Sequence, residues 1–425
     1  MCKKMKMMMK KILKSDFNKN VLTLLTGTTI AQVIPIAISP LLTRIYTPED
    51  FGTFAIILAV TSIISTIATA RYEIAIVLPK KDEDAINLVA LSMGIAILIS
   101  SISLITIVFF ENTIKSILGK DFSYVYLYSI PTIVFFTGFY NSLKYYFIRK
   151  KLYKDLSTTN MFRASVLSTT QITFGYLSLG SLGLILGQVI SSIFANSRMF
   201  LKYFVDWKES DDKSLKSVKT VAKEYISLPK FSAAGSFINA SAQNVNNLLL
   251  PMVFNNQLLG FYSLVNRILG TPTTLIASSI SQVYFQSASA EKNQKGNNIL
   301  SFTSTLKKLI ILSIPLFGVL YLIIDNFIVL IFGKDWEMLE PISKLLLPLF
   351  LIRFISSTLS TTLNIHRKEK EFLLVNIILF LVSVLILIVA KVVSLSIFEY
   401  FGFQSIILSI LYLLLLYRYY IISKG

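Results

Sequence analysis

Apolar segments long enough to cross a membrane recur from one end of this 425-residue chain to the other. Examples are residues 52–70, 85–110, 372–390 and 396–417. A helix of about 20 residues crosses the roughly 30 Å hydrocarbon core of a bilayer, and buried helices of soluble proteins seldom reach that length repeatedly. Because 54% of the residues are hydrophobic and only 15% are charged, we predict an all-α integral membrane protein.

The apolar pattern predicts twelve transmembrane helices. They are expected at residues 20–43, 52–79, 85–110, 122–148, 156–178, 181–205, 231–254, 258–288, 303–325, 338–363, 371–391 and 397–420. Lysine and arginine cluster in alternate connections, for example at Lys80-Lys81, whereas the intervening connections hold few. This positive-inside bias predicts cytoplasmic N- and C-termini in a multi-pass protein. The net charge of +18 then describes a face apposed to anionic membrane lipid, so we expect no nucleic-acid partner.

The longest polar stretch lies at mid-chain and divides the helices into two sets of six. We predict a basic cytoplasmic tail (1–19), a six-helix bundle (20–205), a cytoplasmic linker (206–230) and a second six-helix bundle (231–425). Residues 45–54 align without gaps on residues 253–262, and residues 118–122 on 332–336. Chance similarity between apolar segments is the alternative, because the second match is short. As repeats, the bundles would be related by a pseudo-two-fold axis along the membrane normal, around a central cavity.

Arginines inside the predicted helices are candidates for substrate binding. Arg163, Arg267 and Arg353 fall nearest to mid-membrane, where a charge is costly unless it faces protein or water. Arg71 lies closer to a cytoplasmic helix end, where snorkelling to the headgroups is an equally adequate explanation. Few carboxylates accompany these cations, which suits an anionic substrate. Only Glu73 and Asp325 come near the hydrocarbon, and they are our candidates for ion coupling.

Amide side chains mark two helices as polar on one side. Asn239, Gln243, Asn246 and Asn247 recur at helical spacing on the seventh predicted helix, and Gln32 belongs to a thinner set on the first. Such a face does not point at lipid. It is either an interhelical hydrogen-bond seam or a cavity wall whose amides bind sugar hydroxyls.

The supply of metal-binding and redox side chains is small. The chain has one cysteine, Cys2, and one histidine, His366. An internal disulfide and a Cys/His metal site are therefore excluded. We expect no cofactor, no metal site and no catalytic residue.

Three segments near the N-terminus resemble a known family. They are Leu22 to Gln32, Leu42 to Gly52, and Ala70-Arg71-Tyr72-Glu73 continuing to Pro79. They resemble the start of the Wzx-type oligosaccharide repeat-unit flippases (polysaccharide biosynthesis proteins) of the multidrug/oligosaccharidyl-lipid/polysaccharide exporter superfamily. The resemblance implies two six-helix lobes around a cationic cavity. It also implies a non-enzymatic transporter that moves an undecaprenyl-pyrophosphate-linked oligosaccharide from the cytoplasmic to the periplasmic leaflet of a bacterial inner membrane by alternating access.

Two other functions remain open from the sequence. A cation-coupled drug exporter of the same superfamily shares the architecture, but it should carry buried carboxylates, which are scarce here. A membrane polysaccharide polymerase has similar hydrophobicity, but it should have a large external loop with arginines. Candidate protein partners of a flippase are the polysaccharide polymerase and chain-length proteins.

Overall fold

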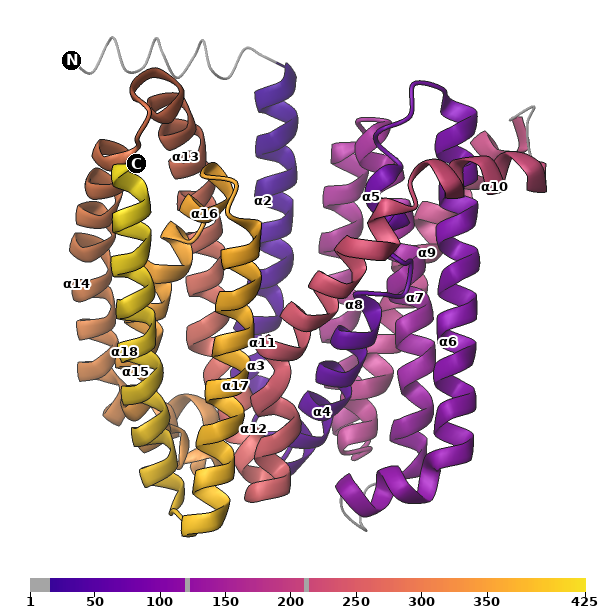
Figure 1. Ribbon diagram of the computed structural model, residues 1–425. Helices are drawn as coiled ribbons and strands as arrows, with labels where there is room; N and C mark the ends of the chain where they lie inside the picture. Colours follow the sequence, from indigo (N-terminus) through magenta and orange to yellow (C-terminus); the bar gives the residue numbers. More distant parts are fainter. Residues whose placement is uncertain (1–15, 119–122, 210–213) are drawn as a thin grey trace. The chain divides into compact units, whose positions relative to one another are not determined.

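The computed structural model describes residues 16–118, 123–209 and 214–425, and every regular element within these ranges is a helix (Figure 1). Most of the predicted tail, 1–19, and most of the echo at 118–122 lie outside the described residues. The chain divides into two compact units. Unit 1 comprises the described residues up to Ile45 and from Ile57 to Phe237, and unit 2 comprises Tyr46–Ile56 and Ile238–Gly425.

The first half of the chain supplies the helices of unit 1 and two helices that continue into unit 2. Its elements are α2 (Asp16–Ala37), α3 (Ser39–Leu42), α4 (Pro48–Ser65), α5 (Tyr72–Ala75), α6 (Asp82–Leu118), α7 (Tyr124–Arg149), α8 (Tyr153–Tyr176), α9 (Ser181–Glu209), α10 (Leu215–Glu224), the π-helical turn η1 (Leu228–Ala233) and α11 (Ala234–Val253). Helix α4 begins in unit 2, and α11 ends there.

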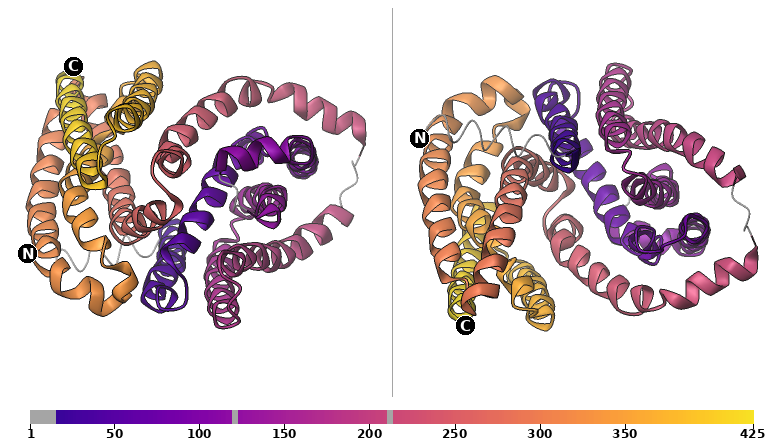
Figure 2. Two further views of the ribbon diagram at one scale, coloured as in Figure 1. Left: turned by 90° about the horizontal axis from the view of Figure 1, so that it is seen from below. Right: turned by 90° about the horizontal axis from the view of Figure 1, so that it is seen from above.

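The second half of the chain forms the rest of unit 2. Its elements are α12 (Asn256–Val265), the π-helical turn η2 (Asn266–Gly270), α13 (Thr271–Lys295), α14 (Ile299–Phe332), the 3-10 turn η3 (Lys334–Trp336), α15 (Leu339–Leu359), α16 (Thr362–Ile365), α17 (Glu369–Val393) and α18 (Ile397–Lys424). Figure 2 views these helices along their lengths.

Every predicted span coincides with one or more of these helices, which confirms the all-α fold. In the described ranges, seven helical segments are both long and apolar enough to cross a membrane: Pro48–Ser65, Asp82–Ser116, Ser181–Glu209, Ile299–Asp325, Leu339–Ile365, Glu369–Val393 and Ile397–Lys424. The other five predicted spans are helical too: α8 and α11 carry more polar residues, and the apolar segment Thr26–Leu42 is shorter.

One predicted span differs clearly from the structure. The sequence predicted a continuous helix over 52–79, but α4 ends at Ser65 and helical structure resumes only at α5. Ala70 and Arg71 in the intervening turns have φ angles of 48° and 67°. This left-handed conformation is unfavourable for residues with a side chain and is incompatible with a continuing right-handed helix.

The core of unit 1 joins α5 to the mid-chain segment that was predicted as a linker. Tyr72 packs in a cluster with Tyr146, Tyr203 and Val221, all of which are buried. The Tyr72 hydroxyl also donates a hydrogen bond of 2.8 Å to the Ala222 carbonyl oxygen. Part of the segment 206–230 is therefore a packed amphipathic helix, α10, rather than an extended connection.

In unit 2, the two copies of the predicted repeat meet at equivalent positions. A Cβ atom on Gly52 would overlap the carbonyl oxygen of Asn256, and a Cβ atom on Gly260 would overlap that of Pro48. The predicted alignment pairs Gly52 with Gly260 and Pro48 with Asn256. The contact is therefore reciprocal, as a local two-fold axis between repeats requires.

Equivalent residues also begin the two helices that meet there. Thr47 and Asp50 cap α4 mutually, with the Asp50 carboxylate accepting from the Thr47 N–H at 3.0 Å. At the equivalent position, Asn255 caps α12 by accepting from the Leu258 N–H at 2.8 Å. These side chains satisfy N–H groups that the first turn of a helix leaves unpaired.

Candidate functional site

Two cavities that share Arg353 and Phe350 lie inside unit 2. The smaller, of about 80 Å³, is lined by polar side chains from five helices together with apolar residues. Its polar lining comprises Gln243 and Asn246 of α11, Tyr262 of α12, Arg353 of α15, Asn376 and Ser383 of α17, and Gln404 and Tyr412 of α18. The larger, of about 150 Å³, is lined by residues of η2, α13 and α15.

Two amide oxygens on the wall of the smaller cavity have no hydrogen-bond donor. They are Oδ1 of Asn246 and Oε1 of Gln404. The residues are 8% and 1% exposed, while the Asn246 amide nitrogen donates to the Tyr262 hydroxyl at 3.1 Å. A buried acceptor without a partner costs about 1–3 kcal/mol, so few are retained in folded proteins. A molecule that donates hydrogen bonds, such as a hydroxyl-bearing ligand or water, would satisfy both.

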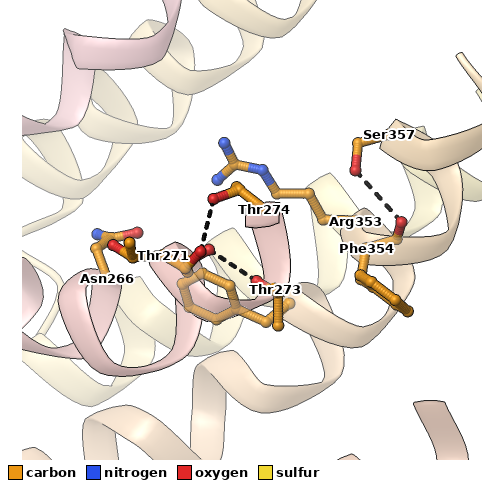
Figure 3. A pocket seen from close by; sticks show the side chains of 9 residues that line it. Asn266, Thr271, Thr273, Thr274, Arg353, Phe354 and Ser357 are labelled. Atoms are coloured by element: carbon orange, nitrogen blue, oxygen red, sulfur yellow. Dashed lines mark hydrogen bonds between the residues drawn. The ribbon is translucent and has the colours of Figure 1, made fainter. Parts of the chain in front are cut away.

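Arg353 gives the pair of cavities its charge. Among the described residues that line the two cavities, Arg353 is the only basic residue, and none is an aspartate or glutamate. Figure 3 shows the side chains of Arg353 and Thr274 extending to the same side from α15 and α13. A guanidinium group stays charged and presents five donors in a planar fork, which matches phosphate and carboxylate oxygens.

The structure brings three of the predicted site residues together at this place. Gln243, Asn246 and Arg353 all line the smaller cavity. Asn239 adjoins them, since its Oδ1 accepts a hydrogen bond of 3.1 Å from the Gln243 amide. Asn247 instead bonds within its own helix, to Asn244 at 3.4 Å.

Arg267 lies in the π-helical turn η2, next to the same region. Its helix neighbours Asn266 and Gly270 line the larger cavity, whereas Arg267 itself is in the lining of neither. Single π-helical turns inside α-helices are frequent at functional sites because they re-aim side chains. The role of Arg267 stays a prediction.

Arg163 and Gln32 belong to unit 1. Arg163 on α8 donates to the Ser192 hydroxyl at 3.1 Å, and its guanidinium lies 5.1 Å from the centre of the Tyr140 ring. Tyr140 in turn donates to the Asn160 side chain. These contacts solvate the Arg163 charge with protein groups from α7 and α9. Gln32 is exposed on α2.

Arg71 and Glu73 flank the break between α4 and α5. They form an ion pair of 3.5 Å, and the Arg71 Nε donates to the Ser232 hydroxyl at 3.4 Å. Glu73, which is 3% exposed, also accepts a hydrogen bond from the Thr69 hydroxyl. The left-handed backbone at Arg71 thus directs the arginine to its own neighbouring carboxylate.

Asp325, the other coupling candidate, belongs to unit 2 and is ion-paired with Lys344. Lys344 also lies 3.6 Å from Glu340, one turn earlier on α15. Both carboxylates that were selected from the sequence are therefore neutralised by basic side chains in this conformation.

Sequence reasoning missed the contribution of the last two helices to the cavity. Gln404, Asn376, Ser383 and Tyr412 come from α17 and α18. A signal was present for Gln404, since an amide inside the apolar run 396–417 is as costly in hydrocarbon as the amides that were selected on α11. Only the fold shows that it lines a cavity together with residues of α11, α12, α15 and α17.

Comparison with solved structures identifies the fold. The structure matches the lipid II flippase MurJ in an inward closed conformation with a TM-score of 0.69 and 14% identity, covering 95% of this chain and 90% of that one. It matches an inward-facing multidrug resistance transporter of the MATE family, from the MOP superfamily, with a TM-score of 0.68 and 13% identity, covering 94% and 96%. The protein is therefore an integral membrane protein with the all-helical fold of these transporters.

Comparison with known sequences identifies the family. The teichuronic acid biosynthesis protein TuaB of Bacillus subtilis (strain 168) is 26% identical over 227 residues, which are 52% of this chain and 45% of that protein's length. The family model described as polysaccharide biosynthesis protein matches residues 41–341. That match covers more than half of the chain and confirms the predicted resemblance, so the chain belongs to the polysaccharide biosynthesis protein family.

Proposed function

We propose that this protein is a flippase that moves a lipid-linked oligosaccharide repeat unit across a bacterial inner membrane. The observation that carries the proposal is the smaller cavity lined by Arg353, in a membrane protein of the polysaccharide biosynthesis family. It combines a cationic guanidinium group with two buried acceptor oxygens, and no carboxylate is among the described residues that line it.

This chemistry suits a substrate that is both anionic and rich in hydroxyl groups. The Arg353 guanidinium would pair with pyrophosphate oxygens, because charge-assisted and bidentate hydrogen bonds to arginine are strong. Asn246 Oδ1 and Gln404 Oε1 would accept from sugar hydroxyls. Undecaprenyl-pyrophosphate carrying one oligosaccharide unit presents both kinds of group. Arg267 and Arg71 remain further candidates for contact with its anionic part, whereas Arg163, which already contacts Ser192 and Tyr140, is the weakest of the predicted arginines.

The topology completes the proposal. With cytoplasmic termini, the basic connections face the leaflet in which lipid-linked sugars are made, and transport proceeds from there to the periplasmic leaflet by alternating access. Glu73 and Asp325 are the candidates for ion coupling, since each would have to exchange its present basic partner for a proton or a metal cation. A polysaccharide polymerase and chain-length proteins are the proposed partners.

Two features of the substrate are to be distinguished: which glycan it carries, and whether it is a glycan lipid or a cationic drug. A teichuronic acid unit, suggested by the name of the Bacillus subtilis relative, and an O-antigen unit are both candidate glycans, since each would be carried on an anionic lipid and is rich in hydroxyl groups. The MATE-like fold alone also fits a drug exporter, since one fold serves several functions. The cationic cavity favours the anionic substrate, because an organic cation beside Arg353 would be repelled.

Reconstitution tests the proposal directly. The full chain is placed in vesicles with a lipid-linked oligosaccharide on both leaflets, and a membrane-impermeant glycan probe is added outside. Protein-free vesicles should leave the inner-leaflet pool unlabelled, whereas vesicles with the protein should label nearly all of it. Uptake of a hydrophobic cation in the same vesicles, without movement of the glycan lipid, would establish the drug exporter instead.

A further inference from the structure

A second cavity region of unit 2, of about 520 Å³, forms a groove between α13 and α14 and has no part in the proposed transport site. The two helices are joined by a short connection at residues 296–298 and run side by side (Figures 1 and 2). Three of the groove's apolar residues are substantially exposed, with exposed fractions of 69% for Val283, 58% for Leu300 and 44% for Leu312.

The lining of this α13–α14 groove changes from polar to apolar along its length. Four hydroxyl side chains, Ser287, Ser301, Ser304 and Thr305, lie toward the connection. Farther along, Ile280, Val283 and Leu312 form an apolar surface over the fully buried Leu309, and Leu300 is the apolar side chain at the polar end. From Ser301 to Leu312 the helix rises roughly 16 Å. The groove is thus amphiphilic in the direction of the helices, which are expected to cross the membrane.

Lys308 lies where the polar part of the groove gives way to the apolar part. It is exposed, and it is the only charged residue among the described residues lining the groove. Glu291, an acidic residue in the last turns of α13, caps α14, with its carboxylate accepting from the Leu300 and Ser301 N–H groups at 3.0 and 2.7 Å. Lys292 donates to the Ile365 carbonyl oxygen at 2.7 Å. Lys308 is therefore the cation that faces the groove.

We propose that the α13–α14 groove binds one anionic phospholipid of the cytoplasmic leaflet. The Lys308 ammonium group and the neighbouring hydroxyls bind the phosphate, and an acyl chain follows Ile280, Val283 and Leu312 toward the bilayer centre. Lysine suits this place because its stem packs on apolar groups while its ammonium reaches the headgroup level. The leaflet follows from the basic residues at the end of α13, Lys292 and Lys295, and from Lys307 and Lys308 farther along α14, through the positive-inside bias.

The chain offers a matched control for the test. Lys307 and Lys308 are adjacent, equally charged and both exposed, but only Lys308 lines the groove. The full-length protein and its variants would be titrated with phosphatidylglycerol and with phosphatidylcholine, and bound lipids would be counted by native mass spectrometry. The wild type should retain one phosphatidylglycerol in preference to phosphatidylcholine.

The two lysine variants should then separate. Lys308→Ala should weaken retention of phosphatidylglycerol about fivefold, as expected for the loss of one lysine at an anionic lipid surface. Lys308→Arg should retain the lipid, and Lys307→Ala should behave as the wild type. Equal losses in the Lys307→Ala and Lys308→Ala proteins would overturn the proposal, because they indicate general attraction to an anionic surface. Absence of a preferred phosphatidylglycerol in the wild type would overturn it as well. Neither result depends on transport.

Discussion

Arg163 in unit 1 and Arg353 in unit 2 were selected by the same reasoning, yet the structure gives them different surroundings. Arg163 is packed against the Tyr140 ring and donates to the Ser192 hydroxyl. Arg353 lines two cavities, and the wall of the smaller one includes two amide oxygens without donors. The cost of a charge in the membrane is met by protein groups in the first case, while the second retains unsatisfied polar atoms beside the charge. A buried arginine is therefore a better indicator of a binding site when its neighbours also lack partners.

The largest effect on transport is expected at Arg353. Arg353→Ala should reduce flipping of the lipid-linked oligosaccharide roughly 10- to 100-fold, as expected for loss of a hydrogen bond to a charged group. Arg353→Lys should lose less, because it keeps the charge and gives up only the bidentate geometry. The glycan-probe assay in vesicles measures both variants, with the amount of folded protein matched. Equal activity of the alanine variant and the wild type would show that Arg353 does not bind the substrate.

A smaller effect on transport is expected at Gln404, where a substitution should lower transport without lowering the stability of the protein. Gln404→Leu removes an acceptor that has no protein donor, so the melting temperature should stay constant or rise. Transport should fall about fivefold, as for one neutral hydrogen bond to the substrate. A variant that unfolds at a lower temperature and transports normally would show that Gln404 is a structural residue.

The smallest effect on transport is expected at Arg163. Arg163→Met removes the contacts with Ser192 and Tyr140, so the protein should melt at a lower temperature, with a loss of about 1–3 kcal/mol in stability. Transport per folded molecule should change less than about twofold, because the protein groups around Arg163 already satisfy its charge. Ser192→Ala provides the milder control. A large loss of transport with unchanged melting would place Arg163 in the substrate path and erase its contrast with Arg353.

The sequence predicted the positions of the helices well because length and hydropathy are local properties. It did not predict the interruption between Ser65 and Tyr72, since Ala70 and Arg71 adopt left-handed backbone angles that their residue types do not favour. The pairing of Arg71 with Glu73 depends on that turn and was missed with it.

The residues that line the candidate site were predicted from the sequence only in part. Helical spacing placed Gln243 and Asn246 on one face of their helix, and the structure places both on the cavity wall. Gln404 was passed over because it stands alone in an apolar helix, where no repeating pattern marks it. The partners of a single polar residue depend on which helices pack together, and local patterns in one sequence do not show that packing.

The reciprocal contact of Gly52 and Gly260 has a consequence for the ancestry of the chain. Each copy of the repeat supplies one glycine and one carbonyl oxygen, so the surface is complementary to itself. A half-length chain carrying a single copy would make the same contact with a second molecule, as in a homodimer. Gene fusion then requires no new interface at this point. In a fused chain, unlike a homodimer, each glycine could be substituted separately. A side chain at either glycine would still overlap the backbone of the other repeat.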